Sequence, residues 1–180
     1  LSAPLLDRFG IRCRLKYYNV DELADIVNRS AGILKIRIED EGAMIIAKRS
    51  RGTPRIANRL LKLTRDLAIV KNKGVITADI AGESLDNWEI DHLGLDELDK
   101  KILMTIIDTY NGGPVGLNSI AVSVGEEPGT IEEVYEPFLV LEGFIRRTSR
   151  GREATDLAYE HLGITKKKAK GKIENGLFDS

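Results

Sequence analysis

Cysteine, aromatic residues, long apolar runs and excess charge of either sign are all scarce in this sequence. One cysteine, Cys13, in 180 residues excludes an internal disulfide and argues against a metal cage, which suits a reducing cytoplasm. No apolar run reaches the roughly 18 residues that span a membrane, and no signal-peptide pattern is present. A formal net charge of −1 gives no overall attraction to nucleic acid. Composition therefore predicts a soluble cytoplasmic protein, of two small domains, in which any DNA binding depends on a local basic patch.

The sequence also lacks the motifs of a self-contained enzyme. No Gly-x-x-x-x-Gly-Lys-Ser/Thr loop is present, because Gly171-Lys172 is followed by Ile173. No apolar strand ends in Asp-Glu to hold a magnesium ion, and the two histidines have no ligands at metal-binding spacing. The first residues, from Leu1 to Pro4, contain no initiator methionine, and we interpret them as a fragment boundary.

Helical periodicity dominates the first half of the chain. Apolar residues at spacings of three and four predict helices over Asp21–Leu34 and Asp40–Ser50. Thr53-Pro54 predicts a third helix start, with threonine as the cap and proline at the first position, and Asn72 ends that helix. Thr77 is expected to cap a fourth helix that reaches Trp88. Before these helices, alternating residues within 1–15 predict a short strand.

The second half predicts three helices followed by a hairpin. We expect a helix after Asp96, a break at Asn111–Pro114 and a short helix over Leu117–Val124. A third helix over Thr130–Leu141 is expected to start with a capping box of Thr130 and Glu133. A strand then begins at Gly143, turns at Ser149–Arg152 and returns as a strand or helix, which is the layout of a winged helix. Beyond Gly163 the chain is rich in lysine, at Lys166, Lys167, Lys168, Lys170 and Lys172, and we expect this tail to be disordered.

Three groups of arginines are candidate binding residues. Arg8, between Pro4 and Gly10, can be held on a rigid turn toward a neighbouring subunit, although pairing with Asp7 is the simpler interpretation. Arg55 projects from the first turn of its helix, where the helix dipole favours an anion, and a plain surface arginine is the alternative. Four arginines are clustered at the predicted hairpin tip and suit a phosphate-binding wing rather than a solvated turn: Arg146, Arg147, Arg150 and Arg152.

Four segments resemble, in order, the signatures of the RuvB family of AAA+ ATPases, which drive Holliday-junction branch migration. They are LSAPLLDRFGI at 1–11, RSRGTPRIANRLL at 49–61, GGPVGL at 112–117 and RTSRGR at 147–152. The resemblance implies a mostly α fold, a small helical AAA+ lid domain followed by a winged-helix domain. The domains it implies are the tail of the large ATPase domain (1–18), the lid (19–89), the winged-helix head (92–163) and the lysine-rich tail (164–180).

The resemblance also implies residue roles. Arg8 resembles the arginine finger that reaches the ATP of an adjacent subunit, and Arg55 the sensor-2 arginine. Tyr18 is similar to a residue lining the nucleotide pocket. Arg147 and Arg152 resemble the DNA-contacting residues, with Arg146 and Arg150 as weaker candidates. Two departures from the family pattern are Leu6, where another arginine is usual, and Leu63, on a helix face that is often basic.

By the same resemblance, the full-length protein is an ATP hydrolase and DNA helicase that uses ATP/ADP with Mg. The fragment alone is expected to hold no cofactor and to be inactive. The implied partners are duplex and Holliday-junction DNA, a homo-hexameric ring, RuvA through the missing large domain, and RuvC; no membrane partner is implied.

Two other classes of protein fit parts of the sequence. A winged-helix transcription regulator with a helical dimerisation domain explains residues 95–162, but it gives no reason for Arg8 or for Thr53-Pro54-Arg55. Its recognition helix would also be acidic, with Glu132, Glu133 and Glu136, which repels DNA. A protein-interaction adaptor that uses this acidic helix is the second alternative.

Overall fold

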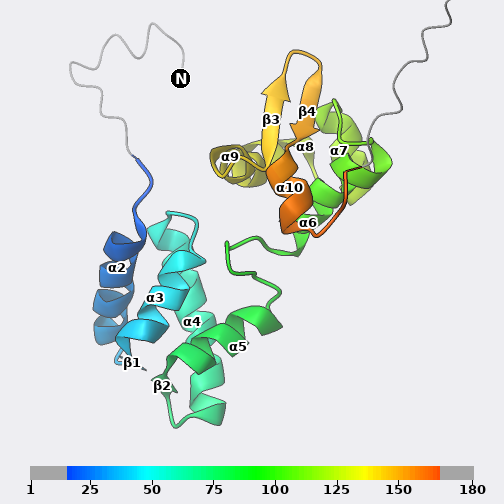
Figure 1. Ribbon diagram of the computed structural model, residues 1–180. Coiled ribbons are helices and arrows are strands. Elements are labelled where there is room, and N and C mark those ends of the chain that lie inside the picture. Colours follow the sequence, from blue (N-terminus) through cyan, green and yellow to red (C-terminus); the bar gives the residue numbers. More distant parts are fainter. Residues whose placement is uncertain (1–15, 167–180) are drawn as a thin grey trace, which may run out of the picture. The chain divides into compact units, whose positions relative to one another are not determined.

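The computed structural model describes residues 16–166, which form two compact units (Figure 1). The boundary between the units along the chain lies between Asp96 and Glu97. The expected strand within 1–15, Arg8, Leu6 and the lysine tail beyond Lys166 lie outside the described residues. In this described part of the chain, no helix has the length and apolar character of a membrane span.

Between residues 16 and 96, the first unit has four helices and one parallel ladder of two residue pairs (Figure 1). All four predicted helices are confirmed, with ends that differ by at most two residues. The ladder joins Arg37 to Val75 and Ile38 to Ile76. It was not predicted, because strands of two residues carry too little periodicity to be recognised. The elements are α2 (Val20–Ile33), β1 (Arg37–Ile38), α3 (Asp40–Lys48), α4 (Pro54–Lys71), β2 (Val75–Ile76) and α5 (Ala78–Asn87).

The helix starts in this unit use different caps. Asn19 and Glu22 form a reciprocal capping box at the start of α2. Thr77 caps α5 as predicted, accepting from the Ile80 amide at 3.3 Å. The prediction for Thr53 is wrong in part. Pro54 does open α4, but the Thr53 hydroxyl donates back to the Arg51 carbonyl and makes no capping hydrogen bond.

One apolar face of each helix forms the core of the first unit. Val27, Ile46 and Leu61 are buried there from three different helices. Leu63 is partly buried and packs against this core. This contact gives a structural reason for an apolar residue at a position that the family resemblance leads one to expect to be basic.

Two arginines fasten the loop that follows α5 onto the turn between α3 and α4. Arg49 Nη1 donates to Asp86 at 2.5 Å and to the Ile90 carbonyl at 2.7 Å. Arg51 Nε donates to the Gly94 carbonyl at 2.7 Å. The loop therefore belongs to the first unit, although the second domain was expected to begin near His92.

The second unit has three helical segments, a hairpin and a final short helix (Figure 1). This is the predicted winged-helix layout. The segment after the turn was predicted as a strand or a helix, and it contains both: a strand that ends at Ala154, followed by a short helix. The elements are α6 (Glu97–Met104), η1 (Thr105–Thr109), α7 (Leu117–Val124), α8 (Pro128–Thr130), η2 (Ile131–Tyr135), α9 (Glu136–Leu141), β3 (Ile145–Thr148), β4 (Gly151–Ala154) and α10 (Asp156–His161).

The third helical segment begins earlier than predicted and is not uniform. Its first residue is Pro128, and Thr130 has helical dihedral angles and makes no capping hydrogen bond, so the predicted capping box is wrong. Five residues, Ile131–Tyr135, adopt π-helical geometry. Pro137 follows this segment and has no amide hydrogen to donate to an α-helical bond.

The hairpin is held by a chain segment from far upstream. β3 and β4 are antiparallel, with Arg147 opposite Arg152. Val115 exchanges two backbone hydrogen bonds with Arg152, at 3.0 and 2.8 Å. The approach is so close that a Cβ on Gly151 would lie 2.3 Å from the Val115 carbonyl oxygen. Two segments quoted separately from the sequence, 112–117 and 147–152, are therefore one structural feature.

Candidate functional sites

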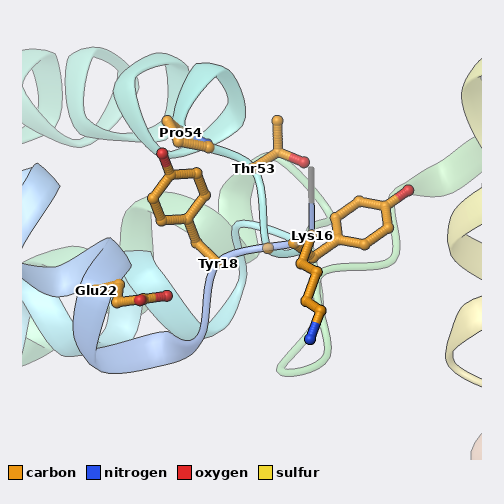
Figure 2. Close-up of a pocket in the computed structure, with 7 residues that line it drawn as sticks. Lys16, Tyr18, Glu22, Thr53 and Pro54 are labelled. Atoms are coloured by element: carbon orange, nitrogen blue, oxygen red, sulfur yellow. The ribbon is translucent and has the colours of Figure 1, made fainter. Parts of the chain in front are cut away.

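An open pocket of about 500 Å³ lies where the chain enters the first unit. Its lining comes from the approach to α2 and from the turn that precedes α4. The Tyr18 amide donates to the Gly52 carbonyl at 3.0 Å and so joins these two segments. The Tyr18 ring lies beside Pro54, while the Lys16 side chain extends in another direction (Figure 2). The lining residues are Lys16, Tyr17, Tyr18, Glu22, Gly52, Thr53 and Pro54.

The chemistry of this pocket suits a flat ring and an anion. Tyr18 is 47% exposed, so its ring face is open to stacking. The pocket also lies at the start of α4, an 18-residue helix whose N-cap residue, Thr53, makes no capping hydrogen bond through its side chain. The positive end of a long helix favours a negative group. Of the polar lining residues, Glu22 is occupied by its capping box with Asn19.

Arg55 faces a second hollow rather than the Tyr18 pocket. It lines an open depression along α4 with Asn58, Arg59, Lys62 and Leu63. Arg55, Arg59 and Lys62 stand four and three residues apart, which places them on one helix face. Tyr18 and Arg55 therefore both lie near the start of α4, but they line different hollows. No group of three or more metal-ligating side chains occurs within residues 16–166.

The four hairpin arginines are not equivalent. Arg150 is at the tip, exposed, and forms no ion pair with a described residue. Arg146 pairs with Glu153 at 2.8 Å, and its side chain is 70% exposed. Arg147 is 51% exposed, whereas Arg152 is only 18% exposed. Only Arg150 fits the expectation of four arginines at the tip, since the other three extend from the strands.

Arg147 and Arg152 both bind the buried carboxylate of Glu136, whose side chain is 1% exposed. Arg147 Nε donates to Glu136 Oε1. Arg152 donates twice, from Nε to Oε1 at 3.1 Å and from Nη2 to Oε2 at 3.0 Å. Glu132, one turn earlier, lies 3.8 and 3.9 Å from the two arginines. These contacts connect the helix start at α9 to both strands of the hairpin.

The charge state of Glu136 follows from these bonds. Burial alone would raise the pKa of Glu136, but the hydrogen bonds and positive charges of Arg147 and Arg152 more than offset it. The pKa of the carboxyl is held below its ordinary value of 4.5. Glu136 is therefore a carboxylate at neutral pH, and its hydrogen bonds hold both arginine side chains in place.

Positive charge in the second unit is confined to a few places. The sequence contains no lysine or arginine between Lys101 and Arg146. The helical segment that would enter a DNA groove in many winged-helix proteins exposes Glu132, Glu133 and Val134. An acidic and apolar face repels a phosphate backbone. This face does not favour the regulator interpretation, and it leaves the hairpin as the candidate nucleic-acid contact.

Comparison with known proteins agrees with this arrangement. Residues 18–91 match the family model of the RuvB AAA lid domain, and residues 92–163 match that of the RuvB C-terminal winged helix domain. The chain belongs to the RuvB family. It is 57% identical over 164 residues to the RuvB subunit of the Holliday junction branch migration complex from Pediococcus pentosaceus. That alignment covers 91% of this chain and 49% of the relative, so the chain spans about half of the relative's length.

Solved RuvB structures give the same result. The Thermotoga maritima RuvB Holliday junction branch migration motor is 52% identical, with a TM-score of 0.87 over 92% of this chain and 55% of that chain. A single-site mutant of the same protein matches at 52% identity and a TM-score of 0.87, covering 91% and 55%. The likeness therefore includes both the lid and the winged-helix domain of RuvB.

Two features of the sites were missed in the sequence. Glu136 was considered only as part of an acidic helix, and its link to the hairpin depends on a long-range contact that spacing does not reveal. The fastening roles of Arg49 and Arg51 were also missed, although both lie in a quoted RuvB segment. A signal was available for Glu136, because a glutamate at an otherwise apolar helix position predicts a buried partner of opposite charge.

Proposed function

We propose that this chain supplies the lid and the DNA-binding head of an ATP-driven motor that moves Holliday junctions during recombination and DNA repair. The observation that carries the proposal is the succession of a RuvB lid and a RuvB winged helix whose exposed arginines are gathered on one hairpin. The activity belongs to the full-length protein, in which an ATPase domain would precede these two.

The lid would report the state of the nucleotide. Tyr18 offers an exposed ring for the base, and the uncapped start of α4 offers a positive helix end to a phosphate. Arg55, on the same first turn, would bind a phosphate from its own subunit. When bound, ATP supplies the phosphoryl group whose transfer to water drives the motor. Because Arg55 moves with α4, loss of its phosphate contact would bias the angle of the lid.

Arg8 would act between subunits. An arginine finger neutralises charge that develops on the transferring phosphoryl group and contributes roughly 10³–10⁵ in rate. If that finger comes from a neighbour, hydrolysis depends on a closed ring. The family resemblance supports a homo-hexamer for this reason, with Mg²⁺ held outside this chain and with RuvA and RuvC as further partners.

The winged helix would hold duplex DNA through the hairpin. Arg147 and Arg152 are the principal contacts and Arg146 and Arg150 the supporting ones. Guanidinium groups on a hairpin suit phosphate oxygens, and phosphate contacts carry no sequence information. A branch-migration motor has to advance through any sequence, so a grip on the backbone alone meets its needs. The acidic helix would stay out of the groove.

A chimera tests this function directly. The chain is joined to the preceding half of the Pediococcus pentosaceus RuvB, and ATP-dependent movement of a four-way junction is measured together with ATP hydrolysis. The proposal predicts that the chimera hydrolyses ATP and moves the junction. A folded chimera that hydrolyses ATP without moving the junction would contradict the role of the head.

A further inference from the structure

We propose that Glu136 is a positioning residue for DNA binding, which holds Arg147 and Arg152 in the orientation in which the hairpin meets phosphate. This inference rests on the proposed DNA-binding function of the hairpin. It adds a residue of the opposite charge to the binding machinery, from a different element of the fold. Glu136 itself is buried and would not touch DNA.

Three hydrogen bonds hold Arg147 and Arg152 against Glu136. Arg152 grips both oxygens of Glu136 through Nε and Nη2, which fixes the plane of its guanidinium. Arg147 uses Nε alone for Glu136. Its two terminal nitrogens make no hydrogen bond to Glu136. Arg147 is thus anchored to Glu136 by Nε, while its Nη2 lies 3.8 Å from Glu132 Oε1 and half of its side chain is exposed.

The carboxylate of Glu136 lies in a mostly apolar environment. Glu136 and Arg152 border a crevice in the hydrophobic core with Ile131, Leu139 and Ile145. An ion pair at such a place is screened less by water than one on the surface. It therefore holds its geometry more firmly than the exposed pair of Arg146 with Glu153.

The helical segment that carries Glu136 is locally distorted just before this residue. The π-helical segment Ile131–Tyr135 ends immediately before Glu136, and Pro137 follows. A π-segment shifts the side chains after it around the helix axis. Glu136 is aimed into the unit, toward the hairpin, while Glu132 and Glu133 are exposed. The distortion accounts for a buried carboxylate on a segment that is otherwise acidic on its surface.

The consequence for DNA binding is a lower entropic cost. Fixing a free, rotamer-rich side chain at an interface opposes binding, and a side chain that is already fixed avoids this cost. For the two arginines, loss of anchoring corresponds to a decrease in affinity of about 3- to 10-fold. The effect would require the arginines, because Glu136 acts only through them.

A mutant cycle separates this role from a general effect on charge or folding. Duplex binding by the 180-residue chain is measured by fluorescence anisotropy at several salt concentrations for the native chain, Glu136→Gln, Arg147→Ala with Arg152→Ala, and the combination of all three. Glu133→Gln is the matched control, because it removes an exposed carboxylate from the same helical segment. We expect Glu136→Gln to weaken binding about 3- to 10-fold and the control to change it by less than about 2-fold. In the variant without the two arginines, Glu136→Gln should have no further effect on binding.

Each outcome has one meaning. If the native chain binds DNA and the arginine variant does not, although circular dichroism shows that the variant is folded, the proposed function of the hairpin stands, whatever Glu136 does. If Glu136→Gln then binds as well as the native chain, the positioning role is wrong. If Glu136→Gln binds more tightly, the role is also wrong, and the carboxylate competes with phosphate for the arginines. If loss of the arginines changes nothing, the proposed function itself is wrong.

A second measurement needs no variant that might fold poorly. In nitrogen-15 spectra of the native chain without DNA, the Nε–H groups of Arg147 and Arg152 should exchange slowly with water and differ from that of Arg150. Addition of duplex should leave the Nε–H of Arg147 protected, because its bond to Glu136 persists in the complex. Rapid exchange of both groups in the free chain would overturn the proposal.

Discussion

Arg147 lies directly opposite Arg152 in the antiparallel register of β3 and β4. Two like charges at facing positions of a hairpin destabilise it unless a counter-charge is supplied. Glu136, from a separate helical segment, supplies that charge and binds both groups. Glu136 therefore stabilises the hairpin that we propose as the DNA contact.

Removal of Arg152 should destabilise the second unit. Arg152→Ala leaves the buried carboxylate of Glu136 with Arg147 as its remaining hydrogen-bond donor. Breaking a buried ion pair typically costs 3–5 kcal/mol, and because one partner stays we expect a decrease in the free energy of unfolding of about 2–3 kcal/mol. Urea unfolding followed by circular dichroism measures this change. Arg150→Ala, at the exposed tip, is the control and should stay within about 0.5 kcal/mol of the native chain.

Stability should fall in acid through Glu136. Its pKa is lowered in the folded chain, so the unfolded state binds more protons and stability rises with pH in this range. The stability that the ionised Glu136 contributes is complete above its ordinary pKa of 4.5 and is lost as pH falls through its lower pKa in the folded chain. The free energy of unfolding, measured between about pH 6 and pH 3, should therefore change less with pH for Glu136→Gln than for the native chain. An identical pH dependence for Glu136→Gln and the native chain would refute this, and Glu142→Gln serves as the exposed control.

The contact between Val115 and the hairpin should tolerate no side chain at Gly151. Gly151 has φ 140° and its added Cβ would meet the Val115 carbonyl oxygen at 2.3 Å. Gly125 has φ 74° with nothing within 4 Å, so Gly125→Ala reports backbone strain without a clash. We expect Gly125→Ala to cost about 1 kcal/mol and Gly151→Ala about 3 kcal/mol, measured by urea unfolding. Equal costs would show that the close approach is not maintained in solution.

The two ATP-directed arginines should affect different steps. In the RuvB chimera, Arg8→Ala should lower ATP hydrolysis about 10³-fold and leave nucleotide binding intact. Arg55→Ala should lower hydrolysis about 10-fold or more, or uncouple it from junction movement. Arg59→Ala, one turn further along α4, is the matched control for loss of a positive charge. Unchanged turnover in Arg8→Ala would remove the role assigned to Arg8. For Arg55→Ala, unchanged turnover together with unchanged nucleotide affinity and junction movement would remove the role assigned to Arg55.

The helices of this chain could be predicted because their signals are local. Thr77, Pro54 and the break at Asn111 mark ends that the structure confirms within a few residues. Errors occurred where two local signals competed. Thr130 and Glu133 match a capping box, but Pro128 already starts the helix, and Thr130 lies inside it.

The sites were less predictable because they depend on contacts between distant segments. Arg147 and Arg152 were recognised as candidates from their clustering, whereas their shared partner Glu136 is 11 and 16 residues away on another element. Similarly, no spacing rule indicates that Arg49 and Arg51 hold the loop after α5. Tyr18 and Arg55 were expected at one nucleotide, and the lid alone gives each its own hollow.

The most direct test of the account is DNA binding by the hairpin. The affinity of the 180-residue chain for two unrelated duplexes and for a four-way junction is measured across a range of salt concentrations, for the native chain and for Arg147→Ala with Arg152→Ala. Arg65→Ala, in the first unit, is the control for loss of an exposed arginine. The account predicts salt-sensitive binding that is similar for both duplex sequences, is lost in the hairpin variant and is kept in the control. Binding that the hairpin variant retains in full, or binding that depends on the duplex sequence, would contradict it.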